Sequence, residues 1–248
     1  MADKVNYVVD ADIKGFFDNI DHDWMVKFLE HDIADKNFIR YIKRFLIGGV
    51  MEDGKKLNTE VGTVQGGMIS PVLANVYLHY VLDTWFVYIS KREFSGEMYM
   101  VRYADDFVCL FQYEQEAQKF YRMLVERMKK FGLELAEDKS RIMPFGRYKG
   151  TKESFDFLGF THYNGKSHWG KYCVLYRTSK KKLKQKRQSA KQWLREHMHE
   201  SVPDTVQKLN KKLVGHYQYY GIYGNWVSLK KFYSYVKYEL WRTKRRRD

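Results

Sequence analysis

Three aspartates in two separate segments carry the chemistry that this sequence most clearly suggests. Asp12 directly follows an apolar run at residues 7–11, and Asp10 lies two residues earlier on the same face of the expected strand. The adjacent pair Asp105 and Asp106 stands between two other apolar runs, where a tight hairpin would place both at its tip. Each segment alone is also typical of a solvated acidic turn, because Asp is common in turns.

Taken together, the two segments predict a metal site made by Asp12 and Asp105, with Asp106 beside them. Carboxylate oxygens suit Mg2+, which usually keeps several waters and takes substrate phosphates as its remaining ligands. Two such ions, about 3.5–4 Å apart, can activate a 3′-hydroxyl and stabilise a leaving pyrophosphate. Phosphoryl transfer depends mainly on positioning and charge stabilisation, so this chemistry requires no Ser or Cys nucleophile.

The elements that must position these acids can be read from periodicity and turn residues. We expect a mixed α+β domain over residues 1–176 and a helical domain over residues 177–248. Strands are expected at 5–11, 97–103, 107–111, 141–144, 155–158 and 172–176, with a hairpin at 50–60. Helices are expected at 22–32, 36–47, 70–91, 114–131, 179–198, 203–219 and 226–242.

The net charge of +14 on 248 residues is unevenly distributed. Residues 1–176 carry 24 basic and 25 acidic side chains, a net charge of −1, whereas residues 177–248 carry 20 and 5, a net charge of +15. A hydrophobic content of 44% excludes a wholly disordered chain. A neutral body with a basic tail region indicates a polyanion partner, most often nucleic acid.

Composition excludes several other classes of protein. No apolar run approaches the roughly 18–20 residues of a membrane-spanning helix, and the N-terminus does not resemble a secretory signal. Cys109 and Cys173 are too few for a four-cysteine zinc site and are expected to be reduced thiols. We therefore expect a protein that is not secreted and has no membrane partner, located in the cytoplasm or associated with the nucleoid.

Five motifs, in family order, resemble the reverse transcriptases encoded by bacterial and organellar group II introns. VVDADIKGFFDNIDHD resembles motif A, TVQGGMISPVLANVYLH motif B, YADD motif C, FGLELAEDKSRIM motif D, and FDFLGF the primer-grip segment. The resemblance implies a right-hand polymerase palm, an antiparallel sheet with packed helices, followed by an all-α, three-helix thumb or maturase domain.

The resemblance also implies roles for single residues. Asp12 and Asp105 match the metal-binding aspartates, Asp106 matches a supporting neighbour, and the Ile13 carbonyl matches a further ligand. The implied cofactor is a pair of Mg2+ ions, with Mn2+ as an alternative. Asp10 and the nearby Asp18 are interpreted as non-ligands.

Further matched positions concern the nucleotide and the primer. Phe17 matches an aromatic that lies under the sugar in related enzymes, although a core aromatic is the alternative. Gln65 and Gly66 match the motif B loop that touches template and nucleotide, with an ordinary loop as the alternative. Lys139 matches a motif D lysine near the pyrophosphate, although a solvated lysine is as typical. The primer grip would comprise Phe157, Leu158 and Gly159.

The basic C-terminal segment is expected to bind structured RNA. The residues assigned to this role are Lys180, Lys181, Lys182, Lys184, Lys186, Arg187, Lys211, Lys212, Arg245 and Arg246. Basic side chains bind phosphates without sequence preference. The interleaved aromatic rings are assigned mainly to packing between helices. The pattern LNKKLVGHYQYY resembles the maturase (X) domain, which binds intron RNA and assists splicing.

The expected function is therefore RNA-directed DNA synthesis together with intron RNA binding that assists splicing and retrohoming. Expected partners are an RNA template, a DNA or RNA primer, dNTPs and intron RNA. Because the motif A strand begins by residue 5, the chain is expected to be a truncated product, a fragment, or one half of a split enzyme whose fingers come from a separate polypeptide or a homodimer. The alternatives are a non-catalytic RNA-binding splicing factor built on a polymerase palm, and a retron or defence-type reverse transcriptase.

Overall fold

A computed structural model describes residues 4–47, 50–52, 55–57, 62, 69–149 and 152–245, with backbone only for 50–52 and 55–57. The chain forms two compact units, Met1–Thr151 and Lys152–Asp248. The expected division at residue 176 separates functional domains and stays a prediction. The compact units divide earlier because the strands at 154–178 pair with one another and join the helices that follow them.

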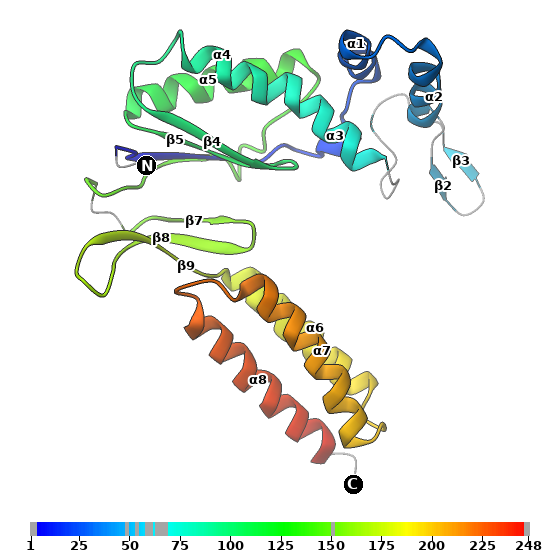
Figure 1. Ribbon diagram of the computed structural model, residues 1–248, viewed down its shortest axis with the longest axis vertical. Helices are drawn as coiled ribbons and strands as arrows, with labels where there is room; N and C mark the ends of the chain where they lie inside the picture. The colour runs from blue at the N-terminus through cyan, green and yellow to red at the C-terminus, as the bar shows by residue number, and fades with distance from the viewer. Residues whose placement is uncertain are drawn as a thin grey trace. The chain divides into compact units, whose positions relative to one another are not determined.

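The first unit contains a four-stranded antiparallel sheet with strand order β4-β5-β1-β6. Its strands are β1 (Tyr7–Ala11), β4 (Met98–Tyr103), β5 (Asp106–Phe111) and β6 (Arg141–Pro144). The other elements are η1 (Phe16–Asp18), α1 (His22–Asp32), α2 (Lys36–Ile47), β2 (Val50–Glu52), β3 (Lys55–Leu57), α3 (Ser70–Leu78), the π-helical turn η2 (His79–Asp83), α4 (Thr84–Ser90) and α5 (Glu114–Lys130). The helices α4 and α5 lie on one side of the sheet (Figure 1).

One face of this sheet is buried beneath helices, and the other carries the acids. Val9 of β1 and Cys109 of β5 are cross-strand partners, and both lie in the buried cluster that includes residues of α3, α4 and α5. Asp10 follows Val9 and therefore lies on the opposite face. The same face of β4 presents Val101 and Tyr103, which are both exposed.

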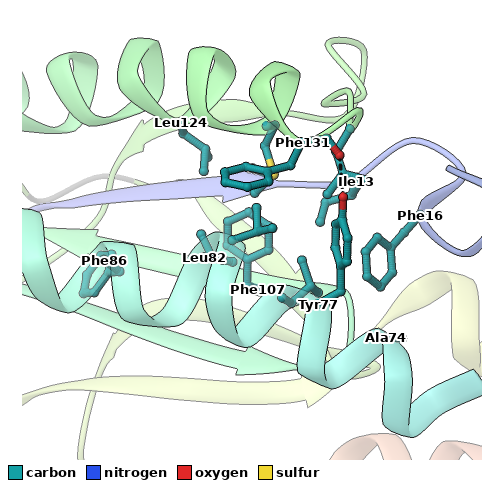
Figure 2. Packing of buried hydrophobic residues seen from close by; sticks show 14 of the residues in the cluster. Ile13, Phe16, Ala74, Tyr77, Leu82, Phe86, Phe107, Leu124 and Phe131 are labelled. Atoms are coloured by element: carbon teal, nitrogen blue, oxygen red, sulfur yellow. Dashed lines mark hydrogen bonds between the residues drawn. The ribbon is translucent and has the colours of Figure 1, made fainter. Parts of the chain in front are cut away.

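Aromatic packing fixes the end of the sheet where the acids lie. Figure 2 shows Tyr77 of α3 between Phe16 and the residues of the core. The Tyr77 hydroxyl is fully buried and donates a hydrogen bond of 2.7 Å to the carbonyl oxygen of Phe131. Burial raises the pKa of Tyr77 well above its usual value, so the hydroxyl remains a donor.

The segment Ser70–Ser90 is long and apolar enough, by length and composition, to cross a membrane. The expectation that no such run exists is therefore wrong on this criterion. Its buried side chains, including Leu73, Tyr77, Leu82 and Phe86, belong to the core beneath the sheet. This core position accounts for the apolar composition.

The second unit combines a three-stranded antiparallel sheet with three helices (Figure 1). The strands are β7 (Ser154–Phe157), β8 (Phe160–Lys166) and β9 (Tyr172–Thr178), and the helices are α6 (Lys180–Glu196), α7 (Val202–Tyr220) and α8 (Trp226–Arg245). The helices share a core of Leu194, Leu209, Leu213, Phe232 and Val236. The three-helix prediction is confirmed, whereas β8 was not predicted, because its sequence FTHYNGK is mostly polar.

Candidate active site

Strand register brings Asp12 and the acidic pair to one end of the sheet. In the β1–β5 ladder, Asp10 pairs with Val108 and Ala11 pairs with Phe107. One further step in the same register sets Asp12 opposite Asp106. Cross-strand partners share a face, so both carboxylates belong to the face opposite Val9 and Cys109.

Asp105 lies in a strained two-residue turn, whereas Asp106, also expected at the tip, is the first residue of β5. Tyr103 pairs with Asp106, which leaves Ala104 and Asp105 as the connection between β4 and β5. Ala104 has a φ of 54°. This left-handed region costs a non-glycine residue about 1–2 kcal/mol, so the surrounding contacts must hold the turn in place.

The backbone around Asp12 is fixed on its other side by the segment before β6. The Ala136 amide donates to the Asp12 carbonyl oxygen at 2.8 Å, and the buried Ile13 forms an isolated bridge with Leu135. The Lys139 ammonium lies 2.9 Å from Asp12 Oδ2. The hydrogen bond from Lys139 to this carboxylate raises the pKa of Lys139.

Asp10 has a different cationic neighbour. Arg141 Nε lies 3.7 Å from Asp10 Oδ2, and the two residues are cross-strand partners in the β1–β6 ladder. Asp10 therefore faces a cation of its own sheet. This pairing is consistent with its interpretation as a non-ligand, which stays a prediction.

The acids fit a metal site that is completed by substrate rather than a closed protein cage. Within the described part of the chain, no group of three or more His, Cys, Asp or Glu side chains is placed to hold a metal. Mg2+ is commonly bound by one or two carboxylates together with substrate phosphates and water. The expected pair of Asp12 and Asp105 matches this kind of site and stays a prediction, and Lys139 would have to release Asp12 before a metal binds there.

The structure describes two of the four residues expected to contact the nucleotide, Phe17 and Lys139. Phe17 is half-buried against the core cluster, with its ring 5.5 Å from that of Phe16. The core alternative therefore has structural support, and the contact with the sugar stays a prediction. Lys139 contacts Asp12, while Gln65 and Gly66 lie outside the described residues.

The primer-grip segment forms a second strained turn, within the second unit. Phe157 pairs with Phe160, and the connecting residues Leu158 and Gly159 have φ values of 49° and 79°. Positive φ at both positions is the pattern of a type I′ turn, which normally takes Asn or Gly first. The Tyr219 hydroxyl donates to the Leu158 carbonyl oxygen at 3.0 Å, which ties the turn to α7.

Most of the predicted RNA-binding residues are exposed, although Lys212 lies 5.3 Å from the Trp193 ring and Arg187 is half-buried. Lys180, Lys181, Lys182, Lys184 and Lys186 are exposed on α6, and Lys211 and Lys212 are exposed on α7. Arg187 is half-buried, with its guanidinium 5.1 Å from the Tyr235 ring and a 3.4 Å hydrogen bond to the Lys231 carbonyl oxygen. Arg187 therefore connects α6 to α8, and its assignment to RNA stays a prediction.

The C-terminal helix presents aromatic rings that were expected to be buried. Arg245 lies over the exposed Trp241 at 5.2 Å, while Arg246 is outside the described residues. Tyr220 and Phe232 are buried as expected. However, six aromatic residues of segment 177–248 are substantially exposed: Tyr219, Tyr223, Trp226, Tyr233, Tyr238 and Trp241. The assignment of the rings mainly to packing is therefore wrong for five of them, whereas Tyr219 stacks on Phe160.

Two residues beside the turn at Ala104 were missed by the sequence reasoning. Arg102 of β4 donates a hydrogen bond of 2.8 Å to the Ala104 carbonyl oxygen and forms an ion pair with Asp83 of η2. A signal was available, because Arg102 follows Met98 and Met100 on the face of β4 that packs against the core. A charged residue at such a position requires a buried partner.

Comparison with known proteins places this arrangement in one family. Residues 2–162 match the reverse transcriptase (RNA-dependent DNA polymerase) family. The group II intron-encoded protein LtrA of Lactococcus lactis subsp. cremoris is 43% identical over 91 residues, which are 37% of this chain and 15% of LtrA. A 91 kDa protein in the cob intron of Schizosaccharomyces pombe is 38% identical over 87 residues, or 35% of this chain and 10% of that protein.

Solved structures show the same fold at low sequence identity. Telomerase from Candida albicans, in complex with a fragment of telomeric RNA, has a TM-score of 0.52 and 14% identity, covering 94% of this chain and 40% of that one. Apo telomerase from Candida tropicalis, truncated from its C-terminal domain, has a TM-score of 0.51 and 15% identity, covering 64% of this chain and 34% of that one. The expected α+β right-hand polymerase fold and the resemblance to group II intron proteins are confirmed. Because the family match spans more than half of its residues, this chain belongs to the reverse transcriptase (RNA-dependent DNA polymerase) family.

Proposed function

We propose that this chain performs RNA-templated DNA synthesis, with Asp12 and Asp105 as the metal-binding residues and Asp106 in support. The observation that carries the proposal is the register that sets Asp12 beside the turn containing Asp105. The Asp12 side chain is 35% exposed and Asp106 is exposed, so these acids are accessible. The strain at Ala104 is of the kind found at functional sites.

In this proposal Mg2+ would be held by the carboxylates of Asp12 and Asp105 and by the Ile13 carbonyl. When bound, the ions would activate the primer 3′-hydroxyl and stabilise the charge of the leaving pyrophosphate. Lys139, paired with Asp12 in this structure, would become free to approach the phosphates. The turn at Leu158, anchored by Tyr219, would contact the primer end.

We further propose that the basic second unit binds intron RNA and assists splicing. Five exposed lysines on α6, together with Arg245 stacked on Trp241, provide phosphate contacts and a ring available to bases. The similarity to LtrA and the RNA complex of the Candida albicans telomerase support an RNA partner. A fingers-containing polypeptide or a second copy of this chain remains the proposed source of further nucleotide contacts.

One observation favours a non-catalytic, RNA-binding alternative. The Asp12 carboxylate is already neutralised by Lys139 at 2.9 Å, as a scaffold without metal would require. Both hypotheses predict RNA binding that weakens with salt. They differ in whether the aspartates are needed for turnover.

Primer extension on an RNA template separates the two hypotheses. The purified chain, with and without a fingers-containing polypeptide, is compared with Asp105→Asn and with Asp23→Asn, an exposed aspartate on α1. We expect weak or no DNA synthesis by the chain alone and clear synthesis when the fingers-containing polypeptide is added. Under the latter condition Asp105→Asn should lose synthesis, whereas Asp23→Asn should keep it. Unchanged RNA affinity in Asp105→Asn would assign the loss to chemistry. Full synthesis by Asp105→Asn would refute the proposed metal role.

A further inference from the structure

We propose that Arg102 is a positioning residue that holds the Asp105 carboxylate in place through the carbonyl group of Ala104. The inference rests on the proposed function, because it assigns Arg102 to the same site. Arg102 touches neither substrate nor metal in this account. It acts through the turn that joins β4 to β5.

The Arg102 guanidinium makes four hydrogen bonds and uses all three of its nitrogens. Nε donates to Asp83 Oδ1 at 2.7 Å and Nη2 donates to the other carboxylate oxygen, so the pair is bidentate. Nη1 donates to the Ala104 carbonyl oxygen at 2.8 Å and to Asn75 Oδ1 at 2.9 Å. One side chain thus connects α3, the π-helical turn η2 and the turn at Ala104.

Burial makes this connection rigid. The Arg102 side chain is 13% exposed and that of Asp83 is 27% exposed. A buried ion pair gains specificity only where geometry and hydrogen bonds are well satisfied. An apolar residue would suit this face of β4 better, since its neighbours Met98 and Met100 pack against the core. Packing alone therefore does not explain why a charged arginine occupies this position.

The bond to Ala104 acts on the strained part of the chain. The Ala104 carbonyl belongs to the planar peptide group that joins Ala104 to Asp105. A hydrogen bond that holds this carbonyl therefore also fixes the orientation of the Asp105 backbone. Ala104 must also be kept at a φ of 54°, which an alanine leaves readily when unrestrained. Without the guanidinium, the turn would relax and the Asp105 carboxylate would shift.

The matched comparison is Arg102→Lys against Arg127→Lys. Arg127 is a half-buried arginine of α5 that also bonds to η2, at the carbonyl oxygens of Val81 and Tyr80 (2.9 and 3.0 Å). It has no recorded bond to the turn at Ala104 within the described residues. Both substitutions keep the charge and lose the fork, but only Arg102→Lys removes the anchor of the turn. Asp83→Asn, which removes only the charge of the partner, serves as a second variant.

Steady-state primer extension distinguishes positioning from general stability. We expect Arg102→Lys to lower kcat about 10- to 100-fold and to raise the half-saturating Mg2+ concentration, with the Kd for primer–template unchanged. Asp83→Asn should shift both values in the same direction by less. Arg127→Lys should lower the unfolding temperature without moving the Mg2+ midpoint. An unchanged Mg2+ midpoint in Arg102→Lys, or the same profile in both arginine variants, would overturn the proposal.

Amide hydrogen exchange keeps this test independent of the proposed function. In Arg102→Lys, but not in Arg127→Lys, the amides of Asp105 and Asp106 should exchange at least several-fold faster than in the wild type. If the wild-type chain makes no DNA under any condition, the proposed function fails, and the exchange result alone decides whether Arg102 holds the turn. Equal exchange in all three proteins would reject it.

Discussion

Two residues with strained backbone conformations lie in the turns that join β4 to β5 and β7 to β8. Ala104 and Leu158 are the non-glycine residues with positive φ in the described part of the chain. Each receives a hydrogen bond at its carbonyl oxygen, from Arg102 and from Tyr219. Such strain, of about 1–2 kcal/mol per residue, persists only when neighbours hold it, and it is concentrated at functional sites.

The ion pair between Lys139 and Asp12 should compete with metal binding. An exposed pair of this kind is worth up to about 1 kcal/mol, so Lys139→Gln should tighten Mn2+ binding by up to about fivefold, as measured by calorimetry. Lys14→Gln is the matched control, because Lys14 forms a looser pair with Glu134 at 4.0 Å and has no recorded contact with Asp12. Weaker Mn2+ binding in Lys139→Gln would show that the ammonium assists the metal site.

At the scale of elements, the buried side chain of Asn225, the residue before α8, connects β9 to the end of α7. Asn225 accepts a hydrogen bond from the Thr178 amide at 2.8 Å and donates to Thr178 Oγ1 and to the Tyr220 carbonyl oxygen, both at 2.9 Å. Its replacement by alanine leaves these buried groups unpaired. We expect Asn225→Ala to lower the unfolding free energy by about 2–4 kcal/mol in urea titrations. Asn210→Ala, at an exposed position on α7, should change it by less than about 0.5 kcal/mol.

A buried histidine between α7 and α8 should make the second unit sensitive to acid. His216 lies 4.1 Å from the Phe232 ring, and neither ring nitrogen has a hydrogen-bond partner. Burial, with a smaller contribution from Lys186, lowers the pKa of His216 from 6.5 to about 4. Between pH 6.5 and about pH 4, His216 is therefore protonated in the unfolded chain but neutral in the folded chain. The free energy of unfolding falls as the pH is lowered through this range.

The resulting loss, up to about 3 kcal/mol, is measured by urea unfolding at pH 7 and pH 4.5. His216→Phe should remove most of the pH dependence, whereas His199→Phe, at an exposed histidine, should retain it. A wild-type pH dependence in His216→Phe would mean that other groups dominate acid unfolding.

Local sequence predicted most elements but not their tertiary relations. Helices and strands were placed within a few residues because their apolar periodicity and turn residues are strong. Helical spacing over 36–47 places Phe38, Ile42, Phe45 and Leu46 on one face, yet Phe38 and Phe45 are exposed, while Ile42 and Leu46 are buried together with Ile39. The π-helical turn η2 and the Arg102–Asp83 pair were missed, because each depends on contacts between residues distant in sequence.

At the scale of the whole molecule, the compact units differ sharply in charge. Residues 1–151 hold 21 basic and 23 acidic side chains, and residues 152–248 hold 23 and 7, giving net charges of −2 and +16. RNA affinity should therefore depend on salt through the second unit. Replacing Lys180, Lys181 and Lys184 by Gln should reduce the slope of log K against log salt by about 2–3.

The same number of charges removed from the first unit provides the control for this prediction. Lys27, Lys91 and Lys129 are all exposed there, and their replacement by Gln should leave the salt slope nearly unchanged. Filter-binding measurements at a series of salt concentrations give both slopes. Equal reductions in the two triple variants would place the RNA surface on both units.

The central claim, that Asp12 and Asp105 support metal-dependent DNA synthesis, is tested most directly by single-turnover primer extension on an RNA template across Mg2+ concentrations, with the fingers-containing polypeptide present. For the wild type we predict a saturable dependence on Mg2+ and no synthesis in its absence. Asp12→Asn and Asp105→Asn should bind primer–template normally and lose at least about 100-fold in rate, a barrier change of roughly 2.7 kcal/mol. Synthesis at wild-type rates in either variant, or synthesis independent of divalent metal, would contradict the account.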